Sequence, residues 1–204
     1  MRYITAFEQN EFKIPTMKKN VFFFAISIML TAAACNSNNK KDPGKIAETK
    51  NENKEDAGTL NKDIDDDIKF VTEVSSGVLM EVELGNYAQE HAASSDVKQF
   101  GATMVKDHSK DRTALEALAA KKNITIPSRP ADDFQKHIDE LEKYEGAEFD
   151  EKYISFMVSD HHDDIDEFTK EVKNGKDEEI VAFANKGLPV LKEHLQMAEA
   201  INKK

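Results

Sequence analysis

Between residues 67 and 202, apolar side chains recur at intervals of three and four residues. This is the period of an α-helix with one side facing a core. The pattern fills four segments, and we expect helices at 67–93, 97–123, 148–173 and 177–202. No stretch of alternating β-branched residues indicates a strand. The sequence therefore predicts an all-α domain.

Short joins link the first helix to the second and the third to the fourth, which predicts two antiparallel hairpins. Ser94 can cap the second helix with its side chain. Asn174 and Gly175 predict a left-handed stop after the third helix. Pro189 lies within the fourth segment, so we expect either a kink there or two helical pieces.

The connection between the second and third helices is longer than the other two. Pro127 and Pro130 end the second helix, and a short helix is expected at 132–144, closed by Gly146. A connection of this length permits a crossover that leaves the second and third helices parallel, as in ferritin-like bundles. We predict a ferritin-like four-helix bundle with a short extra helix in this crossover, and a simple up-and-down bundle is the alternative.

The N-terminal segment has the features of an export signal. A basic start at 17–20 precedes an apolar run at 21–30, and small residues at 31–34 precede Cys35, the only cysteine. A membrane-spanning helix needs about 20 apolar residues, more than 21–34 provide. We predict that 1–34 comprises an upstream extension and a lipoprotein signal peptide, and that Cys35 carries lipid. The alternative is an ordinary secretory signal with an incidental cysteine.

Residues 36–66 are mostly Asn, Lys, Asp and Glu, a composition that rarely supports a core. We expect a disordered tether over 35–66 and one domain over 67–204. The first tether residues are polar and basic, which favours an anchor in the outer membrane facing the periplasm. The expected location is thus the cell envelope, with the membrane contacted through the N-terminal lipid.

The chain has a formal net charge of −11. The segment 1–34 carries four basic residues and two acidic ones, so its removal leaves −13. This balance makes nucleic acid an unsuitable partner, whereas an envelope protein remains a candidate. No cysteine other than Cys35 exists, so no disulfide can stabilise the domain.

Histidines of three different helices share the inward face. His108 and His161 each follow a core Met by four residues and precede an Asp by three, within the similar stretches 104–111 and 157–164. His194 follows Leu191 by three and lies on the same stripe. Asp107 and Asp160, one residue earlier than each of the first two histidines, are expected to point about 100° away.

The first helix places Glu81 in register with Val74, Leu84 and Ala88, and a buried carboxylate needs a partner. Three imidazoles and a carboxylate suit Zn, Fe, Mn or Cu. We predict a mononuclear metal site, with no catalytic residues, from the set Glu81, His108, His161 and His194, and with Asp111, Asp164 and Asp107 as weaker candidates. The alternative is a metal-free polar core in which Glu81 bonds protonated histidine.

A diiron oxidase requires Glu-x-x-His on two helices. Val105, Val158 and Leu191 stand three residues before the inward histidines, so that motif is absent. An enzyme of oxygen or peroxide chemistry is therefore disfavoured. No nucleophile–base pair or phosphate-binding loop is evident either.

Several short stretches together resemble the domain-of-unknown-function 4142 family, whose ferritin-like members are often labelled predicted outer membrane proteins. The resemblance covers about 67–201, and its carriers are 81–85, 97–100, 104–108, Gly146, 149–154, His161 and 188–195. It implies the bundle and export but no established activity. Glu81, Asp107, His108, His161 and His194 match the family pattern, whereas Asp160 and His162 depart from it.

Two functions follow as hypotheses. The first is a metal-binding envelope lipoprotein that buffers or senses a transition metal under stress. The second is a non-catalytic interaction or structural module of the envelope with a metal-free core.

Overall fold

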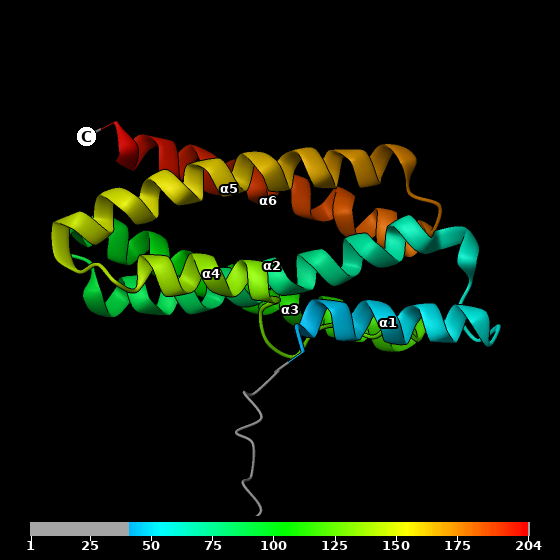
Figure 1. Ribbon diagram of the computed structural model, residues 1–204. Coiled ribbons are helices and arrows are strands. Elements are labelled where there is room, and N and C mark those ends of the chain that lie inside the picture. The colour runs from blue at the N-terminus through cyan, green and yellow to red at the C-terminus, as the bar shows by residue number, and fades with distance from the viewer. Residues whose placement is uncertain (1–40, 204) are drawn as a thin grey trace, which may run out of the picture. The chain divides into compact units, whose positions relative to one another are not determined.

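The computed structural model describes residues 41–203. The predicted signal peptide and Cys35 lie outside the described residues. Within them the chain forms six α-helices and one short 3₁₀ helix at Lys62–Ile64, and no strand beyond an isolated bridge between Ala92 and Gly146. The all-α prediction is thus confirmed for this part of the chain. The helices, shown in Figure 1, are α1 (Pro43–Asp56), α2 (Asp65–His91), α3 (Ser95–Lys122), α4 (Asp132–Leu141), α5 (Gly146–Asn174) and α6 (Glu178–Asn202).

The four long helices form two hairpins, α2 with α3 and α5 with α6, as predicted. The bridge between Ala92 and Gly146 brings the end of α2 to the start of α5. At the opposite end, Lys122 at the end of α3 pairs with Asp177 before α6 at 2.6 Å. Consequently α3 and α5 run in the same direction, which Figure 1 also shows. This is the crossover connectivity expected above, with α4 inside the crossover.

Both ends of α3 are capped locally. Ser94 Oγ accepts a hydrogen bond from Asp96 N at 3.2 Å, as predicted for the N-terminus. At the other end Asn123 adopts a left-handed conformation with φ 59°, which was not among the predicted helix ends. Asparagine tolerates this conformation better than most residues.

The turn between α5 and α6 differs from the prediction. Gly175 has φ −57° and ψ 148°, so the expected left-handed stop is wrong. Instead, the Asp67 carboxylate accepts hydrogen bonds from Lys176 N at 2.9 Å and Asp177 N at 2.5 Å, which fixes the turn against the start of α2. Pro189 lies inside α6, which remains one helix and does not divide into two.

For the described residues 41–66, helix α1 corrects the prediction that 35–66 is a disordered tether. Asn51 of α1 exchanges two hydrogen bonds with the backbone of Thr125, at 3.0 and 2.7 Å, and Lys54 Nζ donates to Asn123 O at 2.7 Å. Asp42 caps the helix by accepting from Gly44 N at 2.9 Å. The segment is ordered by polar contacts to the α3–α4 connection, a source of order that low apolar content does not reveal.

The buried apolar side chains form two clusters. One lies where α2 ends and α5 begins, and the other lies where α2 begins and α5 ends. The first cluster contains Met80, Leu84, Ala88, Ala92, Val97, Phe100, Met104, Ile138, Leu141, Phe149, Tyr153, Ile154, Met157 and Ala198. The second contains Leu60, Ile68, Phe70, Val71, Val74, Val78, Leu115, Ala119, Ile124, Phe168, Ile180, Ala184 and Leu191. His108 of α3, His161 of α5 and His194 of α6 lie between the two clusters, and Glu81 of α2 lies next to Met80, where the clusters meet. We call these four buried polar residues the central layer.

Two glycines bring α2 and α3 close together beside that layer. A Cβ built on Gly85 would lie 2.8 Å from Gly101 O, and one built on Gly101 would lie 2.7 Å from Gly85 O. Neither position accepts a side chain without a backbone shift. Gly85 lies one turn after Glu81, so the same contact sets the distance between Glu81 and α3.

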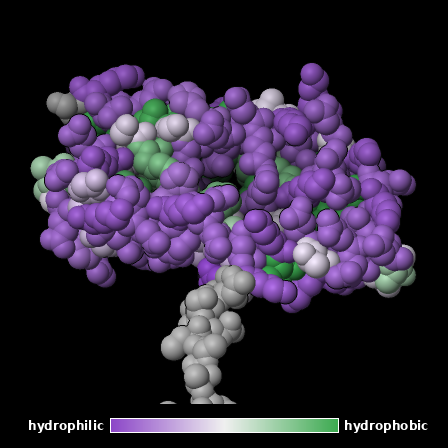
Figure 2. Space-filling model, viewed as in Figure 1, coloured by the Kyte–Doolittle hydropathy of each residue, from purple (hydrophilic) through white to green (hydrophobic). Residues whose placement is uncertain are grey.

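The surface is largely hydrophilic in the view of Figure 2, with apolar side chains showing only in scattered patches. Ile46 is the large apolar residue classed as exposed among those described, at 37%. None of the helices within 41–203 combines the length and the apolar character needed to cross a membrane.

Candidate metal centre

The four residues predicted to share a site meet in the central polar layer. Glu81 on α2, His108 on α3, His161 on α5 and His194 on α6 are all buried, with exposed fractions of 2%, 2%, 0% and 1%. Each belongs to a different long helix, and the apolar clusters cover the layer from both ends. The helical period alone predicted this convergence.

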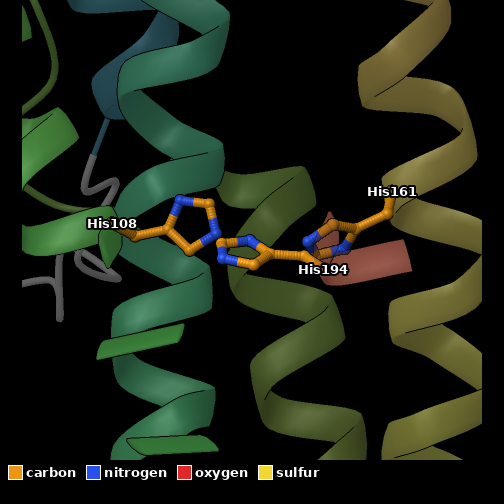
Figure 3. A group of neighbouring side chains, drawn as sticks. All are labelled: His108, His161 and His194. Carbon is orange, nitrogen blue, oxygen red and sulfur yellow. The ribbon is translucent and has the colours of Figure 1, made fainter. Parts of the chain in front are cut away.

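The three imidazole rings approach one another from separate helices (Figure 3). Their centroids are 5.2 Å apart for His108 and His194, 5.5 Å for His161 and His194, and 6.1 Å for His108 and His161. One ring nitrogen of each lies within 4.8 Å of those of the other two. Three nitrogens at this spacing can bind one ion if the three rings move slightly toward one another.

In each histidine, one ring nitrogen has an oxygen beside it. His161 Nδ1 lies 3.0 Å from Met157 O, and because a carbonyl only accepts, Nδ1 carries the proton and Nε2 keeps its lone pair. His194 Nε2 lies 3.5 Å from Asp107 Oδ2. Metal-binding histidines usually donate their second N–H to a carbonyl or carboxylate, which fixes the ring and the tautomer.

His108 follows the same arrangement. Its Nδ1 lies 3.3 Å from Glu81 Oε2 and 3.7 Å from Asp111 Oδ2, so both carboxylates favour a proton on Nδ1. That tautomer leaves Nε2 as the free donor atom. All three histidines can therefore present a lone pair to the centre of the layer.

Five buried polar atoms in this layer have no hydrogen-bond partner. They are Glu81 Oε1, both ring nitrogens of His108, His161 Nε2 and His194 Nδ1. A buried polar group without a partner destabilises a fold by roughly 1–3 kcal/mol. Their concentration at one point, on four helices, is what a site for an ion requires.

The spacing between donor atoms also suits coordination. Glu81 Oε1 lies 3.6 Å from His161 Nε2. Ligand atoms about 2.0–2.1 Å from a tetrahedral metal lie roughly 3.3–3.5 Å from each other. Glu81 and His161 thus already stand near the separation of two ligands of one ion, with no proton between them when both are deprotonated.

Burial controls the protonation of this layer. It lowers the pKa of His108 well below the ordinary range, and neighbouring His194 and His161 add to the effect. Burial, together with His194, lowers the pKa of His161 to about 4. Burial, followed by Asp164, Asp160 and Asp111, raises the pKa of Glu81 well above its usual value. Neutral imidazoles are the metal-binding form, and these directions do not support protonated histidines bonded to Glu81.

His194 is oriented by a charged carboxylate. Burial lowers the pKa of His194, whereas the adjacent Asp107 acts against that shift. Partial burial acts to raise the pKa of Asp107, but hydrogen bonds from Lys110 and His194 bring it below its usual value. Asp107 therefore accepts from His194 Nε2 and leaves Nδ1 free.

The weaker candidates flank the four central residues. Asp111 lies beside His108, and Asp164 falls in a group with Glu81, Asp160 and His161 whose donor atoms are within 4.8 Å of one another. Asp107 and Asp160 were expected to point about 100° away from the inward histidines, and the structure places both beside the site all the same. A residue 100° from the inward direction lies on the flank of its helix, and there it meets the neighbouring helix, α6 for Asp107 and α2 for Asp160. The four-residue spacing of Asp160 and Asp164 was the sequence signal that could have identified Asp160.

A comparison with family models matched residues 45–201 to the family described as "Domain of unknown function (DUF4142)". The match includes most of α1, in agreement with the order of that helix. Comparisons with curated proteins and with solved structures gave no match. Because the matched segment spans most of the chain and includes Glu81, His108, His161 and His194, the chain belongs to the DUF4142 family.

Proposed function

We propose that this protein binds one transition-metal ion in the central layer of its helical domain, through His108, His161, His194 and Glu81. The observation that supports this most directly is the group of five buried polar atoms without hydrogen-bond partners, four of which can present a lone pair: Glu81 Oε1, His108 Nε2, His161 Nε2 and His194 Nδ1. A metal ion would accept the lone pairs that no hydrogen-bond donor reaches. It would also compensate the charge of Glu81.

The donor set limits the metal. Three neutral imidazoles and one carboxylate suit Zn, Fe, Mn or Cu, and availability decides among them. The Glu-x-x-His pairs of diiron oxidases are absent, which favours buffering or sensing of a metal over oxidation chemistry. All four side chains are buried and come from four different helices, an enclosure that favours slow release of a bound ion.

Elemental analysis of the purified lipoprotein tests this proposal. After loading and removal of free ions, we expect about one metal per chain, as a preformed site predicts. Glu81→Ala and His161→Ala should lower this occupancy strongly. His162→Ala is the matched control, because His162 is the next residue on α5 and is exposed. Native protein that retains no metal, or variants that retain it fully, would contradict the proposal.

The location is part of the same proposal. An export signal and lipid on Cys35 would hold the domain in the cell envelope, on the outer membrane facing the periplasm. Metabolic labelling with a radioactive fatty acid should mark the native protein and leave Cys35→Ser unlabelled. Label in both proteins, or in neither, would remove the anchor from the proposal.

A second candidate is a non-catalytic interaction or structural module of the envelope. It is favoured by the Nδ1 contact of His161 with Met157 O and by the carboxylates beside His108 and His194, which can hold the layer without an ion. In that case thermal melting would not respond to a chelator, and crosslinking in cells would capture an envelope partner.

A further inference from the structure

A second group of donor atoms lies next to the histidines. Asp160 and Asp164, one turn apart on α5, meet Glu81 of α2 and His161, with their donor atoms within 4.8 Å of one another. His161 belongs to both groups, whereas His108 and His194 belong only to the first. With Nδ1 bound to Met157 O, His161 has only Nε2 to offer, so one imidazole cannot serve two ions.

The carboxylates of this second group lack a counter-ion. Among the described residues, no Lys or Arg forms an ion pair with Glu81, Asp160 or Asp164, and Glu81 Oε1 is buried without a partner. Their oxygen atoms lie within 4.8 Å of one another. Acids this close repel one another, and a divalent cation between them would remove the repulsion.

A small cavity on the side of the second apolar cluster is lined by Glu81 and Asp164 of this group, and Asp160 lies outside its lining. Its volume is about 30 Å³, room for one or two water molecules or an ion with part of its hydration. Its charged lining residues are all acidic, namely Glu73, Glu81, Asp111, Asp164 and Glu167. An acidic lining of this kind attracts cations and repels anions.

The two oxygens of Glu81 face different neighbours. Oε2 lies 3.3 Å from His108 Nδ1, and Oε1 lies 3.6 Å from His161 Nε2. Because the proton of His108 is on Nδ1, Oε2 faces an N–H group, and Oε1, which is buried without a hydrogen-bond partner, is the oxygen that can contact an ion on either side. Glu81 is therefore the link between the histidine group and the aspartate group.

We propose that Glu81, Asp160 and Asp164 bind a second divalent cation, of the kind that prefers oxygen ligands, next to the ion held by the histidines. Carboxylate oxygens suit Mn²⁺, Mg²⁺ or Ca²⁺, whereas imidazoles suit Zn²⁺ and its neighbours. The centre would then hold two ions of different character. This inference rests on the proposed function only for the neighbouring ion, and its own ligands can be tested separately.

The test uses the purified protein, from which a chelator has first removed any bound metal. Zn²⁺ is added to saturation, with its binding measured in competition with a chromophoric chelator. Mn²⁺ is then titrated, and free Mn²⁺ is read from its six-line electron paramagnetic resonance signal. For the native protein we expect one Zn²⁺ and one Mn²⁺ per chain. Two Zn²⁺ per chain, without Mn²⁺, would equally show two sites.

The variants separate the two sites. Asp160→Asn with Asp164→Asn should keep Zn²⁺ on the histidines and weaken Mn²⁺ binding at least about tenfold, or reduce two Zn²⁺ to one. His194→Ala should weaken Zn²⁺ and retain Mn²⁺. Asp166→Asn, an exposed change on the same helix, should alter neither.

The outcomes are distinguishable. One Zn²⁺ per native chain with no Mn²⁺ bound, or Mn²⁺ binding unaffected by the double Asp→Asn change, overturns the second site. Absence of tight Zn²⁺ binding overturns the proposed function instead. The Asp→Asn changes remove repulsion between carboxylates, so the metal-free double variant should melt at a temperature no lower than that of the native protein. If the double variant does not fold, the single variant Asp164→Asn takes its place in the test.

Discussion

The four long helices contribute both to the apolar clusters at the two ends of the domain and to the central layer between them. The two kinds of region differ in whether their buried groups have partners. In the apolar clusters, Phe149 stacks on Tyr153 with centroids 5.2 Å apart, and both rings are fully buried. In the central layer, His108 is just as buried, but neither of its ring nitrogens has a hydrogen-bond partner. Packing holds the apolar clusters together, and in the first of them the Tyr153 hydroxyl is a single buried polar atom without a partner. The central layer gathers five such atoms at one point, and the chain supplies no partner for them.

This difference predicts two kinds of response to mutation. Changes in an apolar cluster should alter stability whether or not metal is present. Changes in the central layer should act mainly through the bound ion. The four predictions below test this separation, in order of decreasing effect.

The largest effect is expected for Phe149→Ala. Phe149 is fully buried and contacts the rings of Tyr153 and Tyr87. Its loss should lower the free energy of unfolding by about 3–5 kcal/mol, because a cavity replaces the ring. Denaturant unfolding with and without metal would measure this loss. Phe149→Leu should lower the free energy of unfolding by less, because leucine fills part of the cavity. A loss of stability that appears only in the metal-bound protein would show that the apolar cluster and the central layer do not act separately.

The next effect is that of the metal itself. At a free metal concentration about 100 times the dissociation constant, binding should add roughly 2.7 kcal/mol to the stability of the native protein. Thermal melting should show this gain, and a chelator should reverse it. His161→Ala should abolish the gain, and His162→Ala, its exposed neighbour, should preserve it. Equal gains in both variants would place the ion elsewhere.

Gly85→Ala tests the close contact of α2 and α3, which lies between the first apolar cluster and the central layer. Its new Cβ would meet Gly101 O at 2.8 Å and would force α2 and α3 apart, at a cost of roughly 1–3 kcal/mol. Gly77→Ala on the same helix is the matched control, since its Cβ would meet only the Phe134 ring at 3.6 Å. That change should stabilise the helix by about 0.5–1 kcal/mol. Because Gly85 lies one turn from Glu81, we also expect Gly85→Ala to weaken metal binding, and unchanged affinity would show that the helix separation does not set the site.

The smallest effect concerns Glu171, a polar exception near the second apolar cluster. Burial, then Asp67 and Asp66, raises its pKa to about 7, and Oε1 has no partner. A raised pKa means that the fold favours the protonated acid, so this contribution is present below about pH 4.5 and is lost as pH rises through 7. Glu171→Gln should therefore raise the free energy of unfolding at pH 8 by on the order of 1 kcal/mol. At pH 4 the free energy of unfolding should stay nearly the same. Melting at both pH values measures it, and Glu178→Gln on exposed α6 surface is the control. A gain in stability at pH 4 and none at pH 8 would show that Glu171 affects stability in the opposite direction.

Much of the fold followed from the helical period. It placed Glu81, His108, His161 and His194 on one inward face, because residues separated by three or four positions share a side of a helix. The length of the 124–145 connection favoured parallel α3 and α5, and the structure agrees. Local capping rules identified Ser94 for the same reason, since its interaction involves only its neighbours.

The parts that sequence could not predict depend on contacts between distant residues. Helix α1 is ordered by Asn51 and Lys54, whose partners Asn123 and Thr125 lie far along the chain. Asp107 and Asp160 became part of the site only because adjacent helices approach their flanks. The conformation of Gly175 likewise depends on Asp67 of another helix, which binds the backbone on its C-terminal side.

The order of α1 also sets how far the domain can stand from its proposed anchor. A tether over 36–66 would have allowed a reach of roughly 110 Å at full extension, at about 3.5 Å per residue. With Asp42 already fixed as the cap of α1, the segment from Cys35 spans at most roughly 25 Å. If Cys35 carries lipid as proposed, the domain would stay close to the membrane that holds the lipid and would not reach a distant one.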